Sequence, residues 1–203
     1  MTIDELEALP DLERRRLLVA GTAAMGAAGV LAAATPFIQS WNPSERTRAV
    51  GGPIEIDVSR IEPGAMLTVP WRHKPVWVLR RTPQMLAQVA AARPLLLDPA
   101  SSGSIQPGFA SNELRALNPE FMVLLGVCTH LGCTPSPRFQ AGDLALGPDW
   151  PGGFFCQCHG SKYDLAGRVF RGVPAPSNMT VPPYRFVGND RLVIGEDDGQ
   201  RRT

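Results

Sequence analysis

Two short segments carry almost all the side chains of this chain that are suited to metal or redox chemistry. The first is C-T-H-L-G-C at residues 128–133, and the second is C-Q-C-H-G-S-K-Y-D at residues 156–164. Together they hold all four cysteines and two of the three histidines of the 203 residues. Thiolate and imidazole ligands favour zinc, copper and iron–sulfur clusters over hard cations. The two segments therefore predict a metal centre.

The spacing of these ligands bears on which metal is bound. Structural zinc takes four ligands in a closed tetrahedron, usually as two Cys-x-x-Cys or His-x-x-x-His pairs. The two segments instead supply six candidates, and each has a cysteine with a histidine close by: Cys128 with His130, and Cys156 with His159. One cysteine and one histidine from each segment favours a binuclear iron–sulfur cluster. A structural zinc module is the alternative.

The two segments resemble the paired motifs of the Rieske iron–sulfur subunits of bacterial quinol–cytochrome c reductases. The resemblance implies one [2Fe–2S] cluster, in which two cysteines bind one iron and two histidines the other. The implied ligands to metal and cofactor are Cys128, His130, Cys156 and His159. It also implies a disulfide between Cys133 and Cys158. The sequence departs from the family at Gln157, where many members have proline, and this change removes no ligand.

The resemblance also implies roles for residues around the cluster. Neutral imidazoles in place of thiolates remove negative charge, and Rieske potentials accordingly run from about −150 to +300 mV. Hydrogen bonds to sulfur raise the potential further, and the family places the hydroxyls of Ser161 and Tyr163 there. Leu131 and Gly132 would form an exposed tip that docks at a quinol pocket. Pro174 would lie in a rigid proline-rich loop (residues 172–176) that covers the cluster.

The function implied by the resemblance is electron transfer within a proton-translocating quinol–cytochrome c reductase. His159 and His130 would face the quinol, and each would take a proton as the cluster takes an electron. The implied partners are ubiquinol, cytochrome b, a membrane-anchored c-type cytochrome and the lipid bilayer. A Rieske subunit of a photosynthetic quinol–plastocyanin reductase, or of another membrane-bound oxidoreductase, is the alternative. A Rieske ferredoxin or oxygenase is disfavoured, because it normally lacks the second cysteine pair.

The N-terminal part of the chain predicts a membrane anchor. Residues 17–38 contain no charged side chain and are long enough for one transmembrane helix. Three arginines at positions 14–16 indicate that residues 1–16 are cytoplasmic. Thr2-x-x-Glu5 resembles a capping box, which indicates a short helix within this N-terminal part. A cleaved signal peptide is the alternative, and the consecutive arginines partly match a twin-arginine export signal.

The implied disulfide needs an oxidising compartment such as the periplasm. We therefore expect a bacterial inner-membrane protein with one span and a periplasmic cluster domain. Residues 39–52 are polar and end in two glycines, which predicts a flexible hinge or linker. Residues 53–203 would form the Rieske domain, with a cluster-binding lobe at about residues 121–180.

Composition and patterning predict a mainly β fold. Glycine and proline are abundant, at twenty residues each, as in loop-rich β domains. The formal charge of +1 gives no reason to expect nucleic-acid binding. We expect a single N-terminal transmembrane α-helix followed by a Rieske-type antiparallel β-sandwich. The predicted strands are Pro53–Val58, Ala65–Trp71, Lys74–Arg80, Phe121–Gly126, Arg168–Phe170, Thr180–Val187 and Arg191–Gly195.

Three further expectations concern the connections between these strands. His73 lies in the turn between the second and third strands, and we expect it to be exposed and free of metal. Thr82 and Pro83 predict the start of a helix that runs to about Ala91. The segments 94–118 and 135–152 are rich in glycine, proline and serine and are predicted to be irregular.

Overall fold

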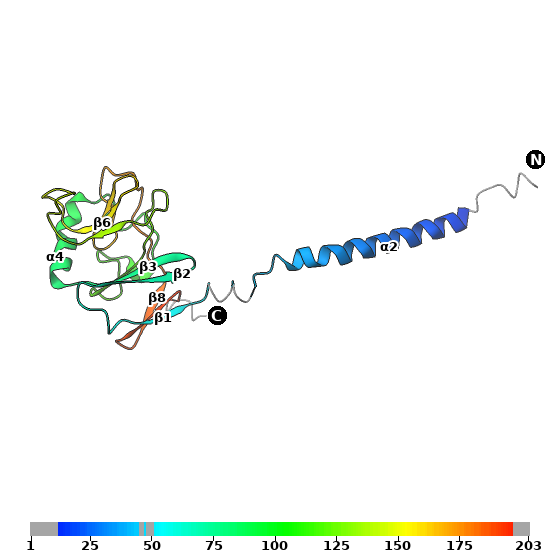
Figure 1. Cartoon of the computed structure of the whole chain (residues 1–203), viewed down its shortest axis with the longest axis horizontal. Helices are drawn as coiled ribbons and strands as arrows, with labels where there is room; N and C mark the ends of the chain where they lie inside the picture. The colour runs from blue at the N-terminus through cyan, green and yellow to red at the C-terminus, as the bar shows by residue number, and fades with distance from the viewer. Residues whose placement is uncertain (1–11, 45–46, 48–50, 197–203) are drawn as a thin grey trace, which may run out of the picture. The chain divides into compact units, whose positions relative to one another are not determined.

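The structure is a computed structural model that describes residues 12–44, 47 and 51–196 (Figure 1). The chain divides into two compact units, residues 1–49 and 50–203. The predicted helix near Thr2 lies outside the described residues, and so does part of the predicted linker. The boundaries that we assign to the cytoplasmic, linker and cluster-binding parts therefore stay predictions.

The described part of the first unit is dominated by helix α2 (Leu12–Gln39). It contains the predicted span 17–38 and begins earlier, so that the three arginines lie in its first turns. Among the described residues, α2 is the one helix that is long and apolar enough to cross a membrane. Thr22 and Thr35 donate their hydroxyl hydrogens to Leu18 O (2.6 Å) and Leu31 O (2.8 Å) within the helix. Such internal bonds satisfy the hydroxyls without water.

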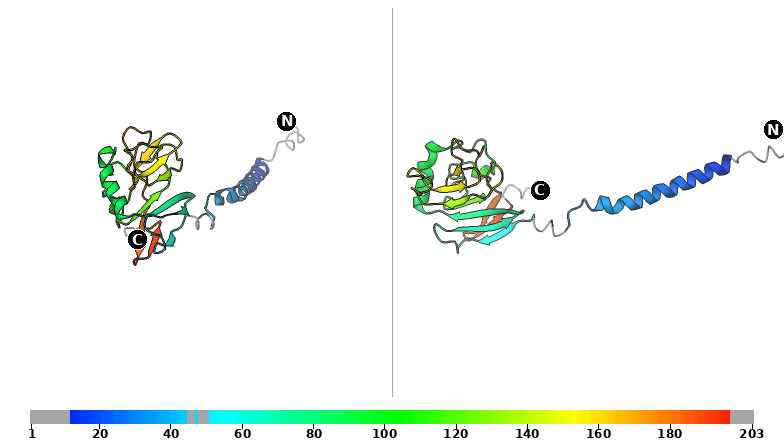
Figure 2. Two further views of the ribbon diagram at one scale, coloured as in Figure 1. Left: turned by 60° about the vertical axis from the view of Figure 1, so that its left-hand side comes forward. Right: turned by 45° about the horizontal axis from the view of Figure 1, so that its top comes forward.

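The second unit contains three small antiparallel sheets, each of three strands. The first sheet has the order β1-β9-β8, the second β2-β3-β4, and the third β5-β6-β7. Figure 2 shows β1, in cyan, beside the red and orange β8–β9 hairpin from the opposite end of this unit. The strands are β1 (Ile54–Asp57), β2 (Met66–Trp71), β3 (Lys74–Arg80), β4 (Phe121–Leu125), β5 (Ser136–Arg138), β6 (Gly153–Cys156), β7 (Ser161–Tyr163), β8 (Tyr184–Val187) and β9 (Arg191–Ile194).

The β2–β3 hairpin forms as the sequence predicts. Its connection is the two-residue turn Arg72-His73, and both residues have positive φ, at 47° and 60°. This is the turn geometry that matches the twist of an antiparallel pair. His73 is exposed at this turn, as predicted. Beside the turn, at the end of β2, Trp71 Nε1 donates to Gly52 O at 3.0 Å and ties the end of the predicted linker to the sheet.

Helix α4 (Pro83–Ala92) begins where its capping residues predict. The Thr82 hydroxyl accepts a hydrogen bond from Met85 N at 3.2 Å, and Pro83 occupies the first helical position, where no N–H is needed. The following excursion contains two single-turn 3₁₀ helices, η1 (Arg93–Leu95) and η2 (Gly108–Ala110), within otherwise irregular backbone.

The base sheet β2-β3-β4 and the cluster-lobe sheet β5-β6-β7 share one hydrophobic core. Trp77 of β3 stacks on Phe154 of β6, with ring centroids 4.8 Å apart. Gly126 lies against the Trp77 ring, and a Cβ at this glycine would be 2.3 Å from the indole. The close packing fixes the cluster lobe on the base, because dense interiors do not tolerate displaced rings.

Two strand predictions are wrong, and the structure contains short strands that the sequence did not predict. Residues 168–170 form isolated bridges, Leu96 with Phe170 and Tyr163 with Val169, rather than a strand. The strand predicted from Thr180 begins only at Tyr184, because the two preceding prolines cannot donate to a ladder. The segment 135–152 contains β5, an edge strand that tolerates Pro137. Strand β7 lies within the second motif, where no strand was predicted.

Candidate metal centre

Two turns, one beginning at Cys128 and the other at Cys156, carry the predicted ligands. Strand β4 leads into the first turn, and the β6–β7 hairpin, which pairs Cys156 with Ser161, forms the second. Each turn is closed by a backbone bond to its first cysteine. Gly132 N donates to Cys128 O at 3.0 Å, and Gly160 N donates to Cys156 O at 2.9 Å.

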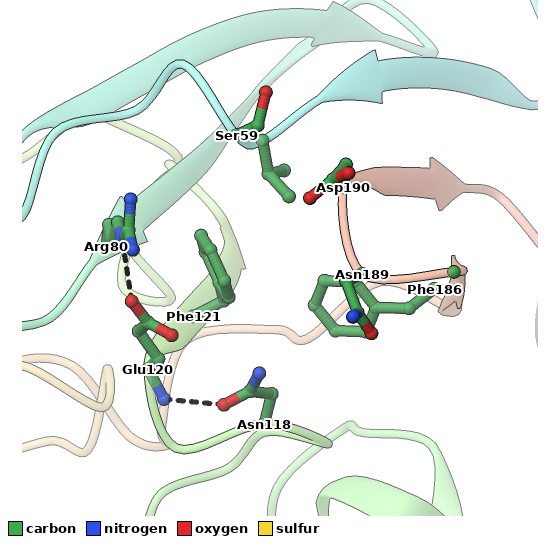
Figure 3. Close-up of a pocket in the computed structure, with 10 residues that line it drawn as sticks. Ser59, Arg80, Asn118, Glu120, Phe121, Phe186, Asn189 and Asp190 are labelled. Atoms are coloured by element: carbon green, nitrogen blue, oxygen red, sulfur yellow. Dashed lines mark hydrogen bonds and ion pairs between the residues drawn. The ribbon is translucent and has the colours of Figure 1, made fainter.

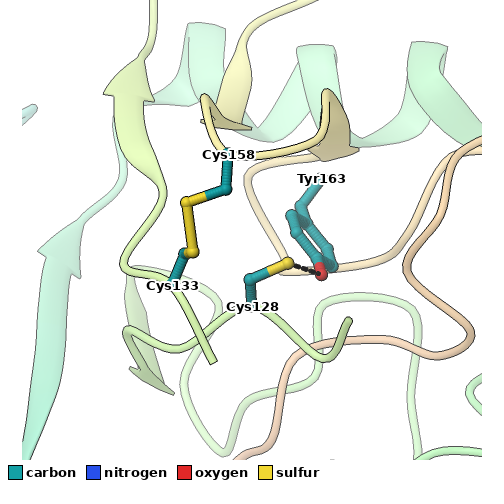
Figure 4. The surroundings of a disulfide bond; sticks show 4 residues. All are labelled: Cys128, Cys133, Cys158 and Tyr163. Carbon is teal, nitrogen blue, oxygen red and sulfur yellow. Dashed lines mark hydrogen bonds between the residues drawn. A yellow bond between two sulfur atoms is a disulfide. The ribbon is translucent and has the colours of Figure 1, made fainter. Parts of the chain in front are cut away.

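A disulfide joins the two turns, and their histidines lie close together. Cys133 is bonded to Cys158 (Figure 4), which is the pair that the family resemblance implies. The ring centroids of His130 and His159 are 4.8 Å apart, with an interplanar angle of 88°. His130 is half-buried and His159 is exposed. The two rings are near enough for one small inorganic group to contact both.

The remaining two cysteines, Cys128 and Cys156, are buried free thiols. Cys128 is 3% exposed and Cys156 is 1% exposed. Burial raises the pKa of Cys128, but hydrogen bonds, chiefly with Tyr163, outweigh burial and the pKa is lowered. Burial and the nearby Cys128 raise the pKa of Cys156. A thiolate at one cysteine thus disfavours a thiolate at the other, because the two negative charges repel. A bound metal cation would offset this repulsion, and the thiolate is the form of cysteine that binds metal.

Tyr163 and Ser161 link the turns to the proline-rich loop. The Tyr163 hydroxyl lies 3.2 Å from Cys128 Sγ (Figure 4) and accepts a hydrogen bond from Thr129 N at 3.1 Å. The Thr129 hydroxyl donates to Ser177 O at 2.7 Å, just after the loop. Ala175 N, within the loop, donates to Ser161 Oγ at 3.1 Å. Both hydroxyls that resemblance assigns to sulfur are therefore held in place by backbone groups.

Residues 109–185 match the family described as Rieske [2Fe-2S] domain, and residues 7–44 match the family described as Ubiquitinol-cytochrome C reductase Fe-S subunit TAT signal. The ubiquinol-cytochrome c reductase iron-sulfur subunit of Allochromatium vinosum is 50% identical over 186 residues, which cover 92% of this chain and 90% of that protein. The chain belongs to the family of ubiquinol-cytochrome c reductase iron-sulfur subunits.

A second relative, matched by sequence, agrees with this membership. The corresponding subunit of Blastochloris viridis is 45% identical over 184 residues, which cover 90% of this chain and 92% of that protein. A solved structure titled Hyperthermophilic respiratory Complex III is 28% identical, with a TM-score of 0.47, and the match covers 85% of this chain and 98% of that chain. As a Rieske protein, the chain carries one [2Fe–2S] cluster. The zinc alternative is therefore wrong.

The residues of the two turns fit this cluster chemically. His130 Nδ1 is buried and has no hydrogen-bond partner, whereas buried polar atoms normally have one. The sulfurs of Cys133, Cys156 and Cys158 lie within 4.8 Å of one another. The disulfide removes two of these three as thiolate ligands. What is left is two free thiols and two imidazoles, the donor set of a Rieske centre.

The other predicted site residues lie at the surface around the turns. Leu131 is 70% exposed at the tip of the first turn, and Gly132 beside it is also exposed. Pro174 is exposed in the proline-rich loop, while Ala175 next to it is buried. The structure thus brings the two turns and this loop together, and it places His73 elsewhere, in the β2–β3 turn.

A cavity of about 460 Å³ lies away from the cluster site (Figure 3). Arg80 and Glu120 on its wall pair with each other at 2.6 Å, and Phe121 forms part of its lining. Asn189 and Asp190, from the turn between β8 and β9, lie on the opposite side. None of the predicted site residues lines this cavity, so the cavity is separate from the candidate metal centre.

The sequence did not predict a group of buried charged residues that pack around the backbone just after the second motif. Asp164 and Arg168 form an ion pair at 2.7 Å, and the side chains are each 1% exposed. Arg81 and Arg115 are buried nearby, and both pack on the turn between these two residues. The only sequence signal is the aspartate that ends the second motif. The arginines carry no local signal, because arginine is ordinarily a surface residue.

Proposed function

We propose that this chain is the electron-transferring subunit of a membrane-bound quinol–cytochrome c reductase. It would take an electron from ubiquinol and pass it to a membrane-anchored c-type cytochrome, next to cytochrome b. The names of relatives at 50% and 45% identity support the quinol–cytochrome c class over the plastocyanin alternative. The observation that carries the proposal is the pair of histidine rings, 4.8 Å apart, on two turns that each also carry a buried free thiol.

The proposed ligands are one cysteine and one histidine from each turn: Cys128, His130, Cys156 and His159. When bound, a Rieske cluster accepts and returns single electrons. The protein would exclude water from one side of the site, because both thiols are buried, Ala175 of the proline-rich loop is bonded to Ser161, and Ser177 just after the loop is bonded to Thr129. Hydroxyl groups at Ser161 and Tyr163 would donate to sulfur and favour the reduced state.

The two histidines would act as proton acceptors for the quinol. The buried Nδ1 of His130 leaves Nε2 as the ring nitrogen that can hold a proton at the surface. His159 is exposed, so its ring is open to a ligand that approaches from outside. Imidazole is the side chain whose charge changes most readily near neutral pH. A quinol hydroxyl bonded to either ring could therefore transfer its proton as the electron leaves.

Leu131 would form an apolar docking surface beside these rings. It is 70% exposed, and the turn that carries it is held by the bond from Cys128 N to Cys133 O at 2.7 Å. Single exposed apolar side chains are common on protein surfaces, so what supports a role here is the place of Leu131 next to the proposed ligand His130. We propose that it contacts the quinol pocket of cytochrome b.

Helix α2 would anchor the subunit in the bacterial inner membrane. Its length, its apolar character and the match of residues 7–44 to a TAT signal family fit a membrane-anchored bacterial complex III subunit. We propose that residues 1–16 are cytoplasmic, because arginines cluster there. The cluster unit would then be periplasmic, where the Cys133–Cys158 disulfide is stable.

The experiment compares three histidine substitutions in the full-length protein purified from membranes. His130→Gln and His159→Gln each remove a proposed ligand, and His73→Gln is the matched control at an exposed turn. Wild type and the control should co-purify with b- and c-type haems, contain iron and acid-labile sulfide, and give an electron paramagnetic resonance signal of low average g value. Both ligand variants should lose that signal and quinol oxidation.

Two results would overturn the proposal. One is a His130→Gln or His159→Gln variant that keeps the cluster signal and full turnover. The other is a wild-type cluster whose reduction potential stays constant across the alkaline range, because proton uptake on a ligand histidine must make the potential fall as the pH rises.

A further inference from the structure

The turn that follows Tyr163 is buried and is organised by one carboxylate. Asp164 Oδ1 accepts hydrogen bonds from Ala166 N at 2.9 Å and Arg168 N at 2.7 Å, and Oδ2 accepts from Arg168 Nε at 2.8 Å. Val169 then forms a bridge back to Tyr163. We call residues 164–168 the Asp164 turn. Its geometry sets where the tyrosine lies, because Tyr163 directly precedes the turn and its two neighbours are bonded across the bridge, Asp164 N to Arg168 O at 2.9 Å and Phe170 N to Lys162 O at 3.0 Å.

Arg115 reaches the Asp164 turn from the excursion between α4 and β4. The side chain is completely buried. Its Nη1 donates to Ala166 O at 3.3 Å and to Gly167 O at 3.4 Å, and its Nη2 donates to Gln106 Oε1 at 3.1 Å. Within residues 51–196, no other hydrogen bond to Ala166 O is present. Arg115 is therefore the group that satisfies this buried carbonyl.

Stability alone does not explain a buried arginine at this position. Burial lowers the pKa of Arg115 to about 10, although Asp164 and Asp98 oppose this effect, so the guanidinium is still cationic at neutral pH. Its Nε has no hydrogen-bond partner. A buried cation with incomplete bonding is often no better than an apolar side chain of similar volume. Its forked shape, which spans the Asp164 turn and Gln106, points instead to a role in positioning.

We propose that Arg115 is a positioning residue for the cluster site, which holds the Asp164 turn so that the Tyr163 hydroxyl stays on Cys128 Sγ. This inference rests on the proposed function, because it assumes that Cys128 binds iron. The hydroxyl and the sulfur are 3.2 Å apart, so a small displacement of the turn would weaken their bond. Loss of a hydrogen bond to a ligand sulfur disfavours the reduced cluster. Loosening the turn should therefore lower the reduction potential.

The test is a set of redox titrations of the full-length protein, followed by the electron paramagnetic resonance signal of the cluster. Tyr163→Phe and Arg115→Met should both lower the midpoint potential, and the shift for Arg115→Met should not exceed that for Tyr163→Phe. The double variant should match Tyr163→Phe alone. Arg115→Lys should behave like Arg115→Met, since one ammonium group cannot contact both Ala166 O and Gln106.

Two outcomes would overturn the inference. Additive shifts in the double variant would show that Arg115 acts independently of Tyr163, and full recovery in Arg115→Lys would show that its charge, not its fork, matters. Should Arg115→Met fail to assemble, Gln106→Leu decides, because it removes the far bond of Arg115 and leaves the Arg115 bonds to the Asp164 turn; it also removes the bond from Gln106 Nε2 to Ser101 O at 2.6 Å. It should give a smaller downward shift that disappears in the Tyr163→Phe background, and an unchanged potential would refute the inference.

The matched control is Arg93→Met, which removes an exposed arginine of the same excursion that pairs with Glu113. Its potential should equal that of wild type. The titration needs neither quinol nor cytochrome, so it can distinguish a failure of the proposed function from a failure of the positioning role of Arg115. A wild-type protein without a Rieske signal would contradict the proposed function, whereas a normal signal that is insensitive to Arg115 would contradict this inference alone.

Discussion

Replacing Asp164 with asparagine should destabilise the second unit more than any surface ion-pair substitution. Asparagine keeps the shape of the side chain and one acceptor oxygen. It places an N–H₂ group where Oδ2 accepts from Arg168 Nε at 2.8 Å and Nη2 at 2.7 Å, so that donors face donors. It also removes the carboxylate that opposes the buried charges of Arg81 and Arg115.

The expected magnitude follows from the burial of this pair. Both side chains are 1% exposed, so water cannot replace the lost partner. Breaking a buried ion pair by removing one partner costs about 3–5 kcal/mol. For a chain of this size, about 1 kcal/mol corresponds to roughly 2–4 °C in the unfolding midpoint. Asp164→Asn should therefore lower the midpoint by roughly 6–20 °C.

The assay is thermal unfolding of the full-length protein in detergent, at a fixed scan rate and with the cluster loaded. Glu55→Gln is the matched control, because Glu55 pairs with Arg191 at 2.9 Å but both side chains are at least half exposed. Exposed pairs contribute about 0–1 kcal/mol, so the control should barely move the midpoint. If Asp164→Asn shifted it no more than the control does, the argument from burial would be refuted.

Three more predictions follow from the geometry. In Gly153→Ala the new Cβ would be 2.0 Å from Tyr163 O, so iron content should fall sharply, whereas Gly108→Ala, with open space around it, should be neutral. At Asp98, burial raises the pKa, but bonds from Ser102, Gly103 and Ser104 outweigh it and lower the pKa below 3.8. Unfolding midpoints of wild type and Asp98→Asn should therefore differ at pH 7 and converge as the pH falls below 3.8; a gap that persists at low pH would contradict this. Removing the cluster leaves the Cys156 thiol within 4.8 Å of the disulfide sulfurs, so peptide mapping should detect disulfides that contain Cys156; exclusive retention of the native pair would contradict exchange.

The sequence predicted the elements whose signals are local. The N-cap and N1 residues Thr82 and Pro83 mark the start of α4, and the run Lys74–Arg80 has the bounds of β3. The Rieske motif predicted the family and the cofactor because its ligand types and spacing are rare. The roles of individual ligands stay predictions, although the structure brings the two turns together.

The sequence could not predict contacts that depend on distant segments. Arg81 and Arg115 lie far along the chain from the Asp164 turn, and nothing in their neighbours shows that both are buried against it. The strand predicted from Thr180 begins only at Tyr184, because the two prolines before it lack the N–H groups that a ladder needs. Strand β7 has only three residues, too few to show an alternating pattern, and they lie within the ligand motif.

The two turns share a backbone plan, and this explains why their histidines are not equivalent. Gly132 and Gly160 occupy matching positions, with φ of +84° and +79°, and no atom lies within 4 Å of a Cβ built on either. Glycine is thus favoured at both positions by the left-handed backbone conformation and not by lack of space. That conformation costs other residues about 1–2 kcal/mol. In the first turn the histidine comes two residues after the cysteine, and in the second it comes three residues after. On similar backbones this offset sends the rings in different directions, so His130 is half-buried with its Nδ1 enclosed and His159 is exposed. The asymmetry supports His159 as the first ring that a quinol meets.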